Sequence, residues 1–271
     1  MRTSINNLNN SSMIILQDQN WLNNQRKAGK IAANALKKLQ GYCENNTFHS
    51  IVTLDEVIGN YIVSERGICT FRGYKGFPRN CCISINQQLV HGIPDDTVLQ
   101  HGDMVSFDLG VTVEGAIADT ALTLIFGTPK SQRQVQLVKD TEEALMRGIS
   151  SIKVGKRIGC IGNAIYKFAQ SKGYGVILNY GGHGISMTSD GIGIPHAPPF
   201  VSNKSDLNEG VRAVPGMTLA IEPQFTTGST KTRVDKDGWT VWCDAEMSCH
   251  VEHTIFIHED RVEIITDRAN I

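Results

Sequence analysis

Apolar residues recur at helical spacing in four segments of the chain, and these segments fall into two pairs. Residues 21–39 carry apolar side chains at every third or fourth position, with Gly41 as the expected end of that helix. A second helix is expected over 54–65, and similar spacing returns over 131–149 and 157–172. The pattern therefore predicts two helical pairs separated by a long non-helical stretch.

Strand patterns follow each helical pair. Residues 82–86 alternate between apolar and polar types, and 104–126 are typical of a β-hairpin with its turn near 113–115. After the second helical pair, strands are expected over 176–179, 217–222 and 250–258. Because helices and then strands occur in that order twice, and no proline-rich linker divides the chain, we predict an internal duplication within one α+β domain. The domain is expected to span 19–271, after a flexible Asn- and Ser-rich lead over 1–18.

The composition is that of an ordinary globular chain. Its 271 residues are 41% apolar and 20% charged, with a formal net charge of −1, so no overall basic field exists to hold nucleic acid or an anionic membrane. No apolar run reaches the roughly 20 residues of a membrane helix, and 13–16 is too short for a signal-peptide core. A cytoplasmic protein is therefore expected. The seven cysteines include no Cys-x-x-Cys pair and are expected to be reduced, which disfavours disulfides or a structural zinc site.

Four carboxylates stand in two matched settings. Asp108 and Glu222 each close a short apolar stretch six residues after a glycine, while Asp119 and Glu252 each stand just before a strand-like run. An acid within a buried strand is costly unless it is paired, hydrogen-bonded or bound to a cation. If Asp108 and Asp119 face each other across the hairpin, their Cβ atoms lie ~4.5–5.5 Å apart, where like charges need a cation between them. The alternative for this pair alone is a solvated hairpin with two surface acids, but four such acids suggest one shared metal site.

His183 is a candidate fifth ligand. It lies between glycines in Gly181-Gly-His-Gly184, which lets the backbone approach closely and leaves the imidazole unobstructed. Hard oxygen ligands with a single imidazole suit divalent Mn, Fe or Co, with Zn also possible. Five such side chains can hold two ions ~3.5–4 Å apart, which lower the pKa of a bridging water and polarise a substrate carbonyl. The residues thus indicate metal-assisted hydrolysis.

The ordered set of five candidate ligands resembles that of the methionine aminopeptidases of peptidase family M24. Further motifs shared with that family are Gly73-Tyr-Lys-Gly-Phe-Pro78, Cys82-Ile-Ser-Ile-Asn86, His91-Gly-Ile-Pro94, Gly182-His-Gly-Ile185, Gly216-Met217, Ile221-Glu-Pro223, Asp237-Gly-Trp-Thr240 and Glu252-His-Thr254. The resemblance runs from about residue 20 to the C-terminus. It implies the pita-bread fold, in which two αβ halves related by a pseudo-twofold surround a central antiparallel sheet. The interval between Glu222 and Glu252 is too short for the helical insertion of the type II branch, so the chain is similar to type I members.

The resemblance also implies roles for individual side chains. The implied metal ligands are Asp108, Asp119, His183, Glu222 and Glu252. Glu222 would also act as the general base for the attacking water, and His91 is expected beside the N-terminus of the substrate. The family has a second histidine seven residues after the ligand histidine, where this chain has Asp190. Because the segment 186–196 is about six residues longer than usual, His196 is the expected oxyanion-stabilising histidine.

Aromatic and apolar residues are implied to form the substrate pocket. The implied lining is Phe71, Tyr74, Phe77, Cys82, His91, His196 and Trp239. A polarisable, apolar lining suits the thioether of methionine, and the alternative is that these are ordinary core residues. Pro195 replaces the aromatic residue or methionine usual before the second histidine, so Ile192 or Ile194 is expected to rebuild that wall. The histidines without motif support are expected to be structural or superficial: His49, His101, His250 and His258. His253 is expected to support the neighbouring ligand Glu252.

The expected activity is removal of the N-terminal methionine from new polypeptides whose second residue is small. The expected cofactors are two divalent ions (Co, Mn, Fe or Zn), and the expected partner is a nascent peptide N-terminus. A transient ribosome contact is also expected, with no nucleic-acid cofactor, no membrane and a monomeric state. Two alternatives remain open. One is a pita-bread aminopeptidase with a different P1 preference, suggested by the segment 186–196 and Pro195. The other is a non-catalytic pita-bread binding protein, which would normally have lost some of the five ligands.

Overall fold

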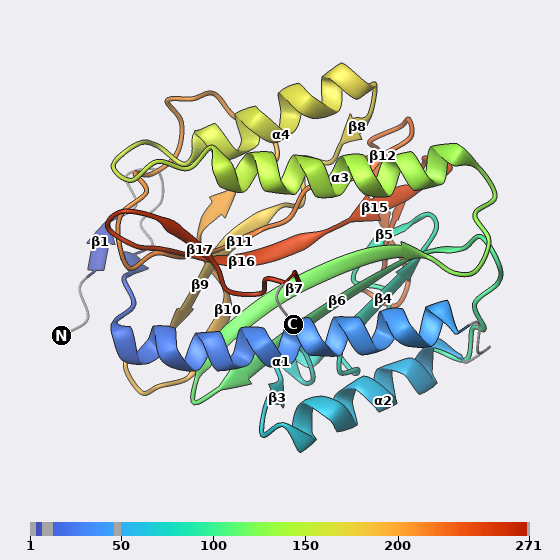
Figure 1. Cartoon of the computed structure of the whole chain (residues 1–271), viewed down its shortest axis with the longest axis horizontal. Helices are drawn as coiled ribbons and strands as arrows, with labels where there is room; N and C mark the ends of the chain where they lie inside the picture. Colours follow the sequence, from blue (N-terminus) through green and yellow to red (C-terminus); the bar gives the residue numbers. More distant parts are fainter. Residues whose placement is uncertain (1–3, 7–12, 46–49, 270–271) are drawn as a thin grey trace.

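The computed structural model describes residues 4–6, 13–45 and 50–269. The helices α1 (Gln19–Glu44) and α3 (Gln132–Ser150) lie across one face of a large sheet, with α2 (Ile51–Ser64) and α4 (Gly159–Lys172) outside them (Figure 1). All four predicted helices are confirmed. The predicted end of the first helix at Gly41 is wrong, because Cys43 extends the buried face of α1 by another turn.

The central sheet has nine strands among the described residues. Their order is β10-β9-β11-β16-β7-β6-β3, with β17 beside β16 and β4 beside β6, and every pair is antiparallel. The bounds are β3 Ile68–Cys69, β4 Cys82–Ile85, β6 Met104–Val113, β7 Ala116–Ile125, β9 Gly182–Met187, β10 Gly193–Val201, β11 Thr218–Ile221, β16 Glu252–Ile257 and β17 Val262–Ile264. The predicted α+β class with a central antiparallel sheet is confirmed.

The strands β6 and β7 form the predicted hairpin, but its register differs from the expected one. Residues 114–115 join the strands with positive φ values of 48° and 76°, as tight two-residue hairpin turns require. With this turn, Asp108 faces Ala121 and Asp119 faces Gly110. The prediction that the two acids face each other directly is therefore wrong, because the turn lies one residue later than such pairing needs. They are diagonal neighbours on one face of the hairpin.

Short strands make three smaller sheets beside the central one. Their bounds are β1 Ser4–Asn6 with β2 Met13–Ile15; β8 Gly175–Val176, β12 Gln224–Thr226 and β15 Ser248–His250; and β5 Gln88–Val90, β13 Thr232–Val234 and β14 Val241–Cys243. The predicted strand over 250–258 is interrupted at Val251, so that β15 and β16 belong to different sheets. His250 and Glu252, on either side of this interruption, both line the site described below.

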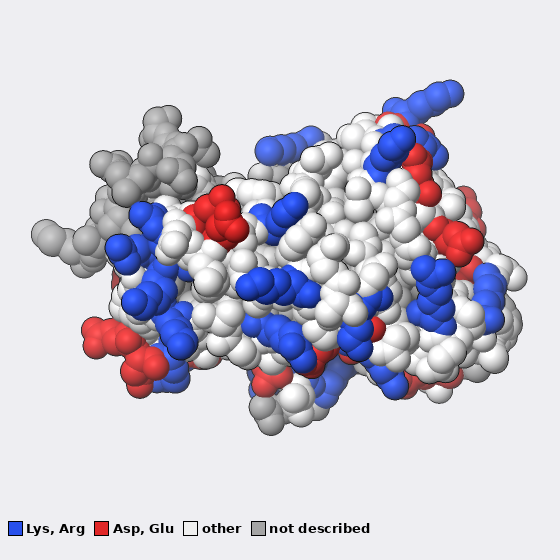
Figure 2. Space-filling view, turned by 90° about the horizontal axis from the view of Figure 1, so that it is seen from above, with Lys and Arg blue, Asp and Glu red and all other residues white. Residues whose placement is uncertain are grey.

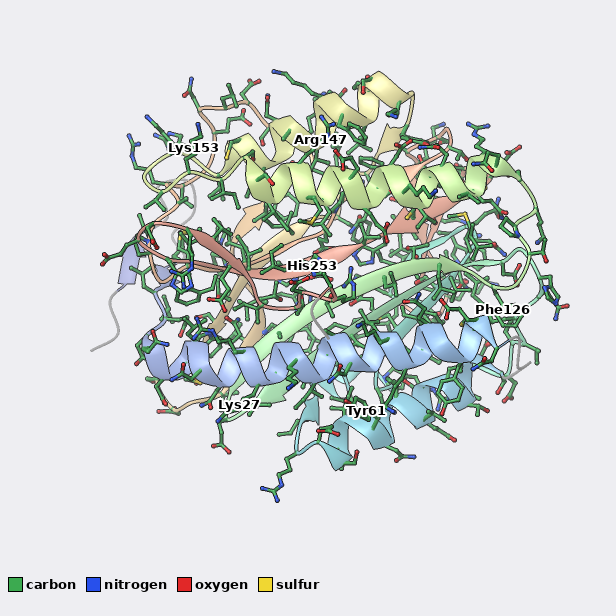
Figure 3. The ribbon with its side chains drawn as sticks, in the orientation of Figure 1. Lys27, Tyr61, Phe126, Arg147, Lys153 and His253 are labelled. Carbon is green, nitrogen blue, oxygen red and sulfur yellow. The ribbon has the colours of Figure 1, made fainter. Side chains whose placement is uncertain are left out.

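Each helical pair covers its own apolar core. One cluster joins Leu36 of α1 and Ile58 of α2 to Phe107 of β6, and a second joins Leu145 of α3 and Ile161 of α4 to strands of the other half. The arrangement is the structural counterpart of the predicted duplication. Figure 3 shows His253 at the level of the sheet, between α1 and α3, whereas Arg147 and Lys153 lie at the outer side by α3 and α4.

The predicted flexible lead is partly described. Met13–Ile15 forms β2, Ile14 is buried in the second core, and the Gln17 amide donates a hydrogen bond to Ser186 Oγ at 3.2 Å. Residues 13–18 are thus packed on the domain, in contrast to the expectation, while 1–3 and 7–12 lie outside the described residues. Within the described ranges, no helix combines the length and apolar character needed to cross a membrane.

Asp55 ties α2 to the loop that precedes β4. Its buried carboxylate accepts hydrogen bonds from the Asn80 backbone N–H (2.8 Å), the Asn80 side-chain amide (3.1 Å) and the Cys81 backbone N–H (2.9 Å). We expect Asp55→Ala to lower the free energy of unfolding by about 3 kcal/mol, because buried donors lose their acceptor. Urea denaturation measures this loss, and Asp55→Asn, which keeps one acceptor oxygen, is the control with a smaller expected loss. Equal stability of wild type and Asp55→Ala would contradict this role.

Candidate metal centre and active site

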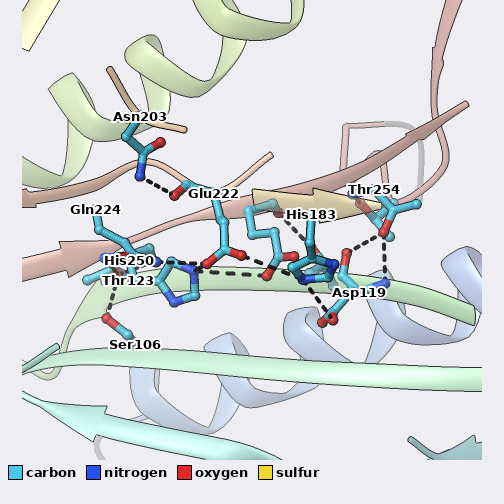
Figure 4. Close-up of polar contacts among 12 residues, drawn as sticks. Ser106, Asp119, Thr123, His183, Asn203, Glu222, Gln224, His250 and Thr254 are labelled. Carbon is cyan, nitrogen blue, oxygen red and sulfur yellow. Dashed lines mark hydrogen bonds and ion pairs between the residues drawn. The ribbon is translucent and has the colours of Figure 1, made fainter. Parts of the chain in front are cut away.

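The five predicted ligands lie on neighbouring strands of the central sheet. Asp108 is on β6, Asp119 on β7, His183 on β9 and Glu252 on β16, and Glu222 directly follows β11. These strands are consecutive in the sheet, so side chains far apart in the sequence come side by side (Figure 4). The structure thus brings together all five candidate ligands in a largely buried cluster.

The ligand atoms are close enough to share cations. His183 Nε2 lies 3.6 Å from Glu222 Oε1 and 4.0 Å from Asp119 Oδ2. Two overlapping groups of side chains each have their candidate ligand atoms within 4.8 Å of one another. One group is His183, Glu222 and Glu252, and the other is Asp108, Asp119 and Glu252. Glu252 belongs to both groups, so its carboxylate could contribute to both sets of candidate ligands.

The carboxylates have the electrostatics of a cation site. Burial, reinforced by neighbouring acids, raises the pKa values of Asp108 and Glu252 well above their ordinary range. Burial also raises the pKa of Asp119 to about 6, against the opposing charge of His183. Asp108 Oδ1, Asp119 Oδ1 and Glu252 Oε1 are buried without a hydrogen-bond partner among the described residues. Divalent cations would satisfy these oxygens and keep the acids ionised, so the donor set fits a metal centre.

Two glycines allow the strand that carries His183 to lie close to its neighbours. A Cβ atom on Gly182 would overlap the backbone oxygen of Ala220, and one on Gly184 would overlap that of Pro198. Side chains at these positions would push β9 away from β11 and β10. The glycine pair around His183 therefore places its imidazole among the acids, as the sequence pattern suggested.

Glu222 is held at both ends. Its backbone oxygen accepts a hydrogen bond from the Asn203 amide at 3.0 Å, and its Oε2 accepts one from the Gln224 amide at 2.7 Å (Figure 4). Burial opposes ionisation, but the contact with His250 and the charges of His250 and His183 outweigh it and lower the pKa of Glu222 to about 2. Glu222 is therefore ionised and oriented, with Oε1 toward His183.

His250 is a site residue that the sequence reasoning missed. Its Nε2 lies 3.3 Å from Glu222 Oε2 and 3.9 Å from Glu252 Oε2, and the residue is only 1% exposed. The expectation of a structural or superficial histidine is therefore wrong. A signal was present, because His250 stands two residues before Glu252, and residues two apart in an extended chain share a face.

A cavity of about 300 Å³ opens above the acids. Its lining includes all of the residues predicted for the pocket, Phe71, Tyr74, Phe77, Cys82, His91, His196 and Trp239, together with Lys75 and Val90, which were not predicted. Phe77 and Trp239 meet edge to face with ring centroids 5.1 Å apart, and Phe71, Phe77 and Cys82 pack as one cluster.

The cavity wall beside His196 differs from the expected one. Ile192 is 66% exposed, and neither Ile192 nor Ile194 lines the cavity, so the prediction that one of them rebuilds this wall is wrong. Instead, the Tyr74 ring stacks on His196 with centroids 5.3 Å apart. The tip of the β9–β10 hairpin lies against the β6–β7 turn, where Gly191 is close to Gly115.

The two remaining candidate histidines flank the acids. The His196 ring lies 4.4 Å from that of His183, and a nitrogen of His196 is within 4.8 Å of ligand atoms of His183 and Asp119. His196 is exposed at the cavity mouth. Desolvation of its ring by the surrounding cavity walls, and then the charge of His183, lower its pKa from the ordinary value. His91 contacts the edges of Tyr180 and Trp239, with centroids 5.9 and 6.4 Å away. Tyr180 is thus a second residue that sequence reasoning missed.

The His91 imidazole is expected to stay neutral throughout the physiological range. Burial lowers its pKa to about 4, although Glu222 acts in the opposite direction. Because the folded pKa lies below the unfolded value of about 6.5, this histidine stabilises the fold fully above the unfolded value. That contribution declines as pH falls toward 4. Histidine NMR titration of the metal-free protein measures the midpoint, with the urea-unfolded chain as reference. A folded midpoint between 6 and 7 would contradict the expected burial.

The remaining described histidines, His101, His253 and His258, have partners outside the acid cluster. His101 contacts Phe126, and His258 Nε2 lies 2.6 Å from Glu263 Oε2. His253 Nδ1 lies 2.8 Å from Thr266 Oγ1, and it remains a prediction that this histidine supports Glu252. His49 is the histidine outside the described residues.

Comparison with known proteins assigns the chain to a family. Residues 23–259 match metallopeptidase family M24. Methionine aminopeptidase of Mycoplasma capricolum is 36% identical over 255 residues, which cover 94% of this chain and 98% of that protein. Methionine aminopeptidase of Escherichia coli K12 is 37% identical over 248 residues, or 90% of each. The chain therefore belongs to metallopeptidase family M24.

Solved structures agree with this assignment. A methionine aminopeptidase from Thermotoga maritima superposes with a TM-score of 0.87 at 33% identity, covering 94% of this chain and 100% of that one. A methionine aminopeptidase from Rickettsia prowazekii gives a TM-score of 0.86 at 33% identity over the same shares. The prolidase from Pyrococcus furiosus shares the fold, with a TM-score of 0.68 at 18% identity. The predicted pita-bread fold and the predicted resemblance to methionine aminopeptidases are confirmed.

Proposed function

We propose that this protein is a metal-dependent aminopeptidase that hydrolyses the peptide bond after an N-terminal methionine when the second residue is small. The observation that carries the proposal is a cluster at the floor of a cavity with aromatic walls, which joins His183 to three buried carboxylates and the partly buried Glu222. The similarity of the protein to methionine aminopeptidases along nearly the whole chain supports the same activity. A non-catalytic binding protein would have no need of buried acids that destabilise the metal-free fold.

The five clustered side chains are the proposed metal ligands, and they would hold two divalent ions, Co, Mn, Fe or Zn. Bound ions would lower the pKa of a water molecule and polarise the scissile carbonyl. Glu222 is the proposed general base, since its ionised carboxylate can accept a proton from the attacking water at neutral pH. Gln224 supports this role by donating to Oε2, which leaves Oε1 directed toward His183.

The two flanking histidines are proposed to handle the substrate. His91 is neutral in its buried position and can donate one ring N–H to the carbonyl of the substrate amide or accept a hydrogen bond from its amine. His196, beside His183, is proposed to donate a hydrogen bond to the carbonyl oxygen as it gains negative charge in the tetrahedral state. Both roles require a substrate whose N-terminus enters the cavity.

The apolar wall is proposed to select methionine. Phe71, Phe77, Cys82 and Trp239 form a continuous surface of aromatic rings and one thiol. Such a surface favours a long, unbranched thioether over charged or short side chains. Tyr74, stacked on His196, would close the wall that Pro195 leaves open.

Activity of metal-stripped protein tests the proposal. A Met-Ala-Ser peptide should remain intact without metal and should release methionine when Mn, Fe, Co or Zn is restored. A panel of X-Ala peptides tests the side-chain preference, and faster cleavage of Leu-Ala or Ala-Ala than of Met-Ala would replace the methionine assignment by a different P1 preference. Absence of turnover with every metal and peptide would favour the binding-protein alternative.

The proposed partner is a new polypeptide, and we infer a transient ribosome contact of a monomeric, cytoplasmic enzyme. The face over α3 and α4 carries more Lys and Arg than Asp and Glu (Figure 2). Within 130–172, nine Lys or Arg stand against three Asp or Glu, whereas the whole chain has a net charge of −1. A local basic face of this kind favours salt-sensitive contact with RNA phosphates. Co-sedimentation with ribosomes at low and high salt tests the contact.

A further inference from the structure

The ring of His250 is buried without a hydrogen-bond partner for either nitrogen. Both Nδ1 and Nε2 lack such a partner among the described residues, although His250 is 1% exposed and lines the cavity. The backbone of the same residue is anchored, since its N–H donates to Thr123 Oγ1 at 3.1 Å and its oxygen accepts from that hydroxyl at 2.6 Å. Nε2 has only ion-pair contacts, at 3.3 Å with Glu222 Oε2 and 3.9 Å with Glu252 Oε2, and Nδ1 has no such contact among the described residues, so this buried and anchored ring is placed to bind a further partner.

The two imidazoles of the site occupy comparable positions around Glu222. His183 Nε2 lies 3.6 Å from Glu222 Oε1, and His250 Nε2 lies 3.3 Å from Glu222 Oε2 and 3.9 Å from Glu252 Oε2 (Figure 4). Separations of this size are those of donor atoms that share one ion with bonds of ~2.0–2.2 Å. Gln224 already donates to Glu222 Oε2 at 2.7 Å, so Glu222 does not need His250 for hydrogen bonding.

We propose that His250 supplies a second imidazole ligand to the ion that His183, Glu222 and Glu252 would hold. This inference rests on the proposed metal centre and extends its donor set from five side chains to six. A second nitrogen donor favours Co²⁺ and Zn²⁺ over Mn²⁺, because imidazole suits the former and an all-oxygen set suits the latter. His250 would thus adjust the metal preference of this particular enzyme.

A count of coordinated imidazoles tests the proposal. The full-length protein, labelled with ¹⁵N-histidine and loaded with Co²⁺, should show two sets of paramagnetically shifted ring signals, and His250→Gln should show one. His196→Gln is the matched control, because His196 also lies near His183 and Asp119 but is not a proposed ligand, and this variant should therefore retain two sets. Chelator competition should show a loss of Co²⁺ affinity of at least about tenfold in His250→Gln, and a smaller loss for Mn²⁺.

Several outcomes would overturn the proposal. One set of shifted signals in the wild type would do so, as would two sets in His250→Gln or loss of one set in His196→Gln. If circular dichroism shows that His250→Gln is unfolded, the wild-type count and the His196→Gln control still decide. Met-Ala-Ser hydrolysis by the wild type is measured in parallel. Turnover with a single coordinated imidazole overturns the role of His250 alone, whereas absence of Co²⁺ binding and turnover overturns the proposed metal centre as well.

Discussion

Asp108→Asn is expected to make the metal-free protein more stable while it abolishes peptide hydrolysis. Asp108 is buried, its Oδ1 has no hydrogen-bond partner among the described residues, and burial with the neighbouring acids Asp119 and Glu222 disfavours its charge. Removal of that charge should raise the free energy of unfolding without metal by about 1–2 kcal/mol. The same substitution removes a proposed ligand, so metal binding and turnover should be lost.

Urea denaturation with and without Co²⁺ separates these effects. Wild type should gain stability on metal addition, by about 2.7 kcal/mol at a free ion concentration of 100 times Kd, and Asp108→Asn should gain almost nothing. Asp103→Asn is the matched control, because Asp103 is buried but accepts hydrogen bonds from the Gln100 N–H and the Asn86 amide. It should lower stability by about 1 kcal/mol and keep the response to metal. A less stable metal-free Asp108→Asn that still responds to Co²⁺ would rule out this account.

The periodicity of apolar residues in the sequence was sufficient to predict the helices and the long hairpin and to identify the acidic residues of the site. Helices and the long hairpin follow from local spacing of apolar residues, and Asp108 is conspicuous because it interrupts such a run. The register of the hairpin could not be obtained in the same way. A shift of the turn by one residue changes every cross-strand partner, and both 113–114 and 114–115 contain residues acceptable in a turn.

The parts of the site that escaped prediction depend on contacts between distant segments. His250 belongs to a short strand that pairs with β12, whereas Glu252 begins β16 of the central sheet, and the sequence does not show that the chain changes sheets at Val251 beside the cavity. Tyr180 contacts His91 from another part of the chain, and the wall beside His196 comes from Tyr74 rather than from the adjacent hairpin. The local spacing of apolar residues does not predict such contacts between distant segments, whereas a motif with several fixed positions does.

Glu222→Gln is expected to lower kcat by a factor of about 10²–10⁴ and to leave KM nearly unchanged. Glutamine has the shape of glutamate and can still present one oxygen toward His183, but it cannot take a proton from water. The cavity wall that would bind methionine is formed by other residues, such as Phe77 and Trp239, so substrate binding should persist.

Pre-steady-state and steady-state hydrolysis of Met-Ala-Ser by metal-loaded Glu222→Gln measures this effect, and metal content must be determined on the same samples. Glu222 is both a proposed ligand and the proposed base, so only samples with wild-type metal content report on proton transfer. Gln224→Met provides the matched comparison. It leaves the carboxylate intact and removes the 2.7 Å hydrogen bond to Oε2, and should therefore lower kcat far less.

Turnover of fully loaded Glu222→Gln within a factor of ten of wild type would exclude Glu222 as the base. His196 or His91 would then have to accept the proton. Both are neutral at neutral pH, but their lowered pKa values, that of His91 about 4, make them weaker bases than an ordinary histidine.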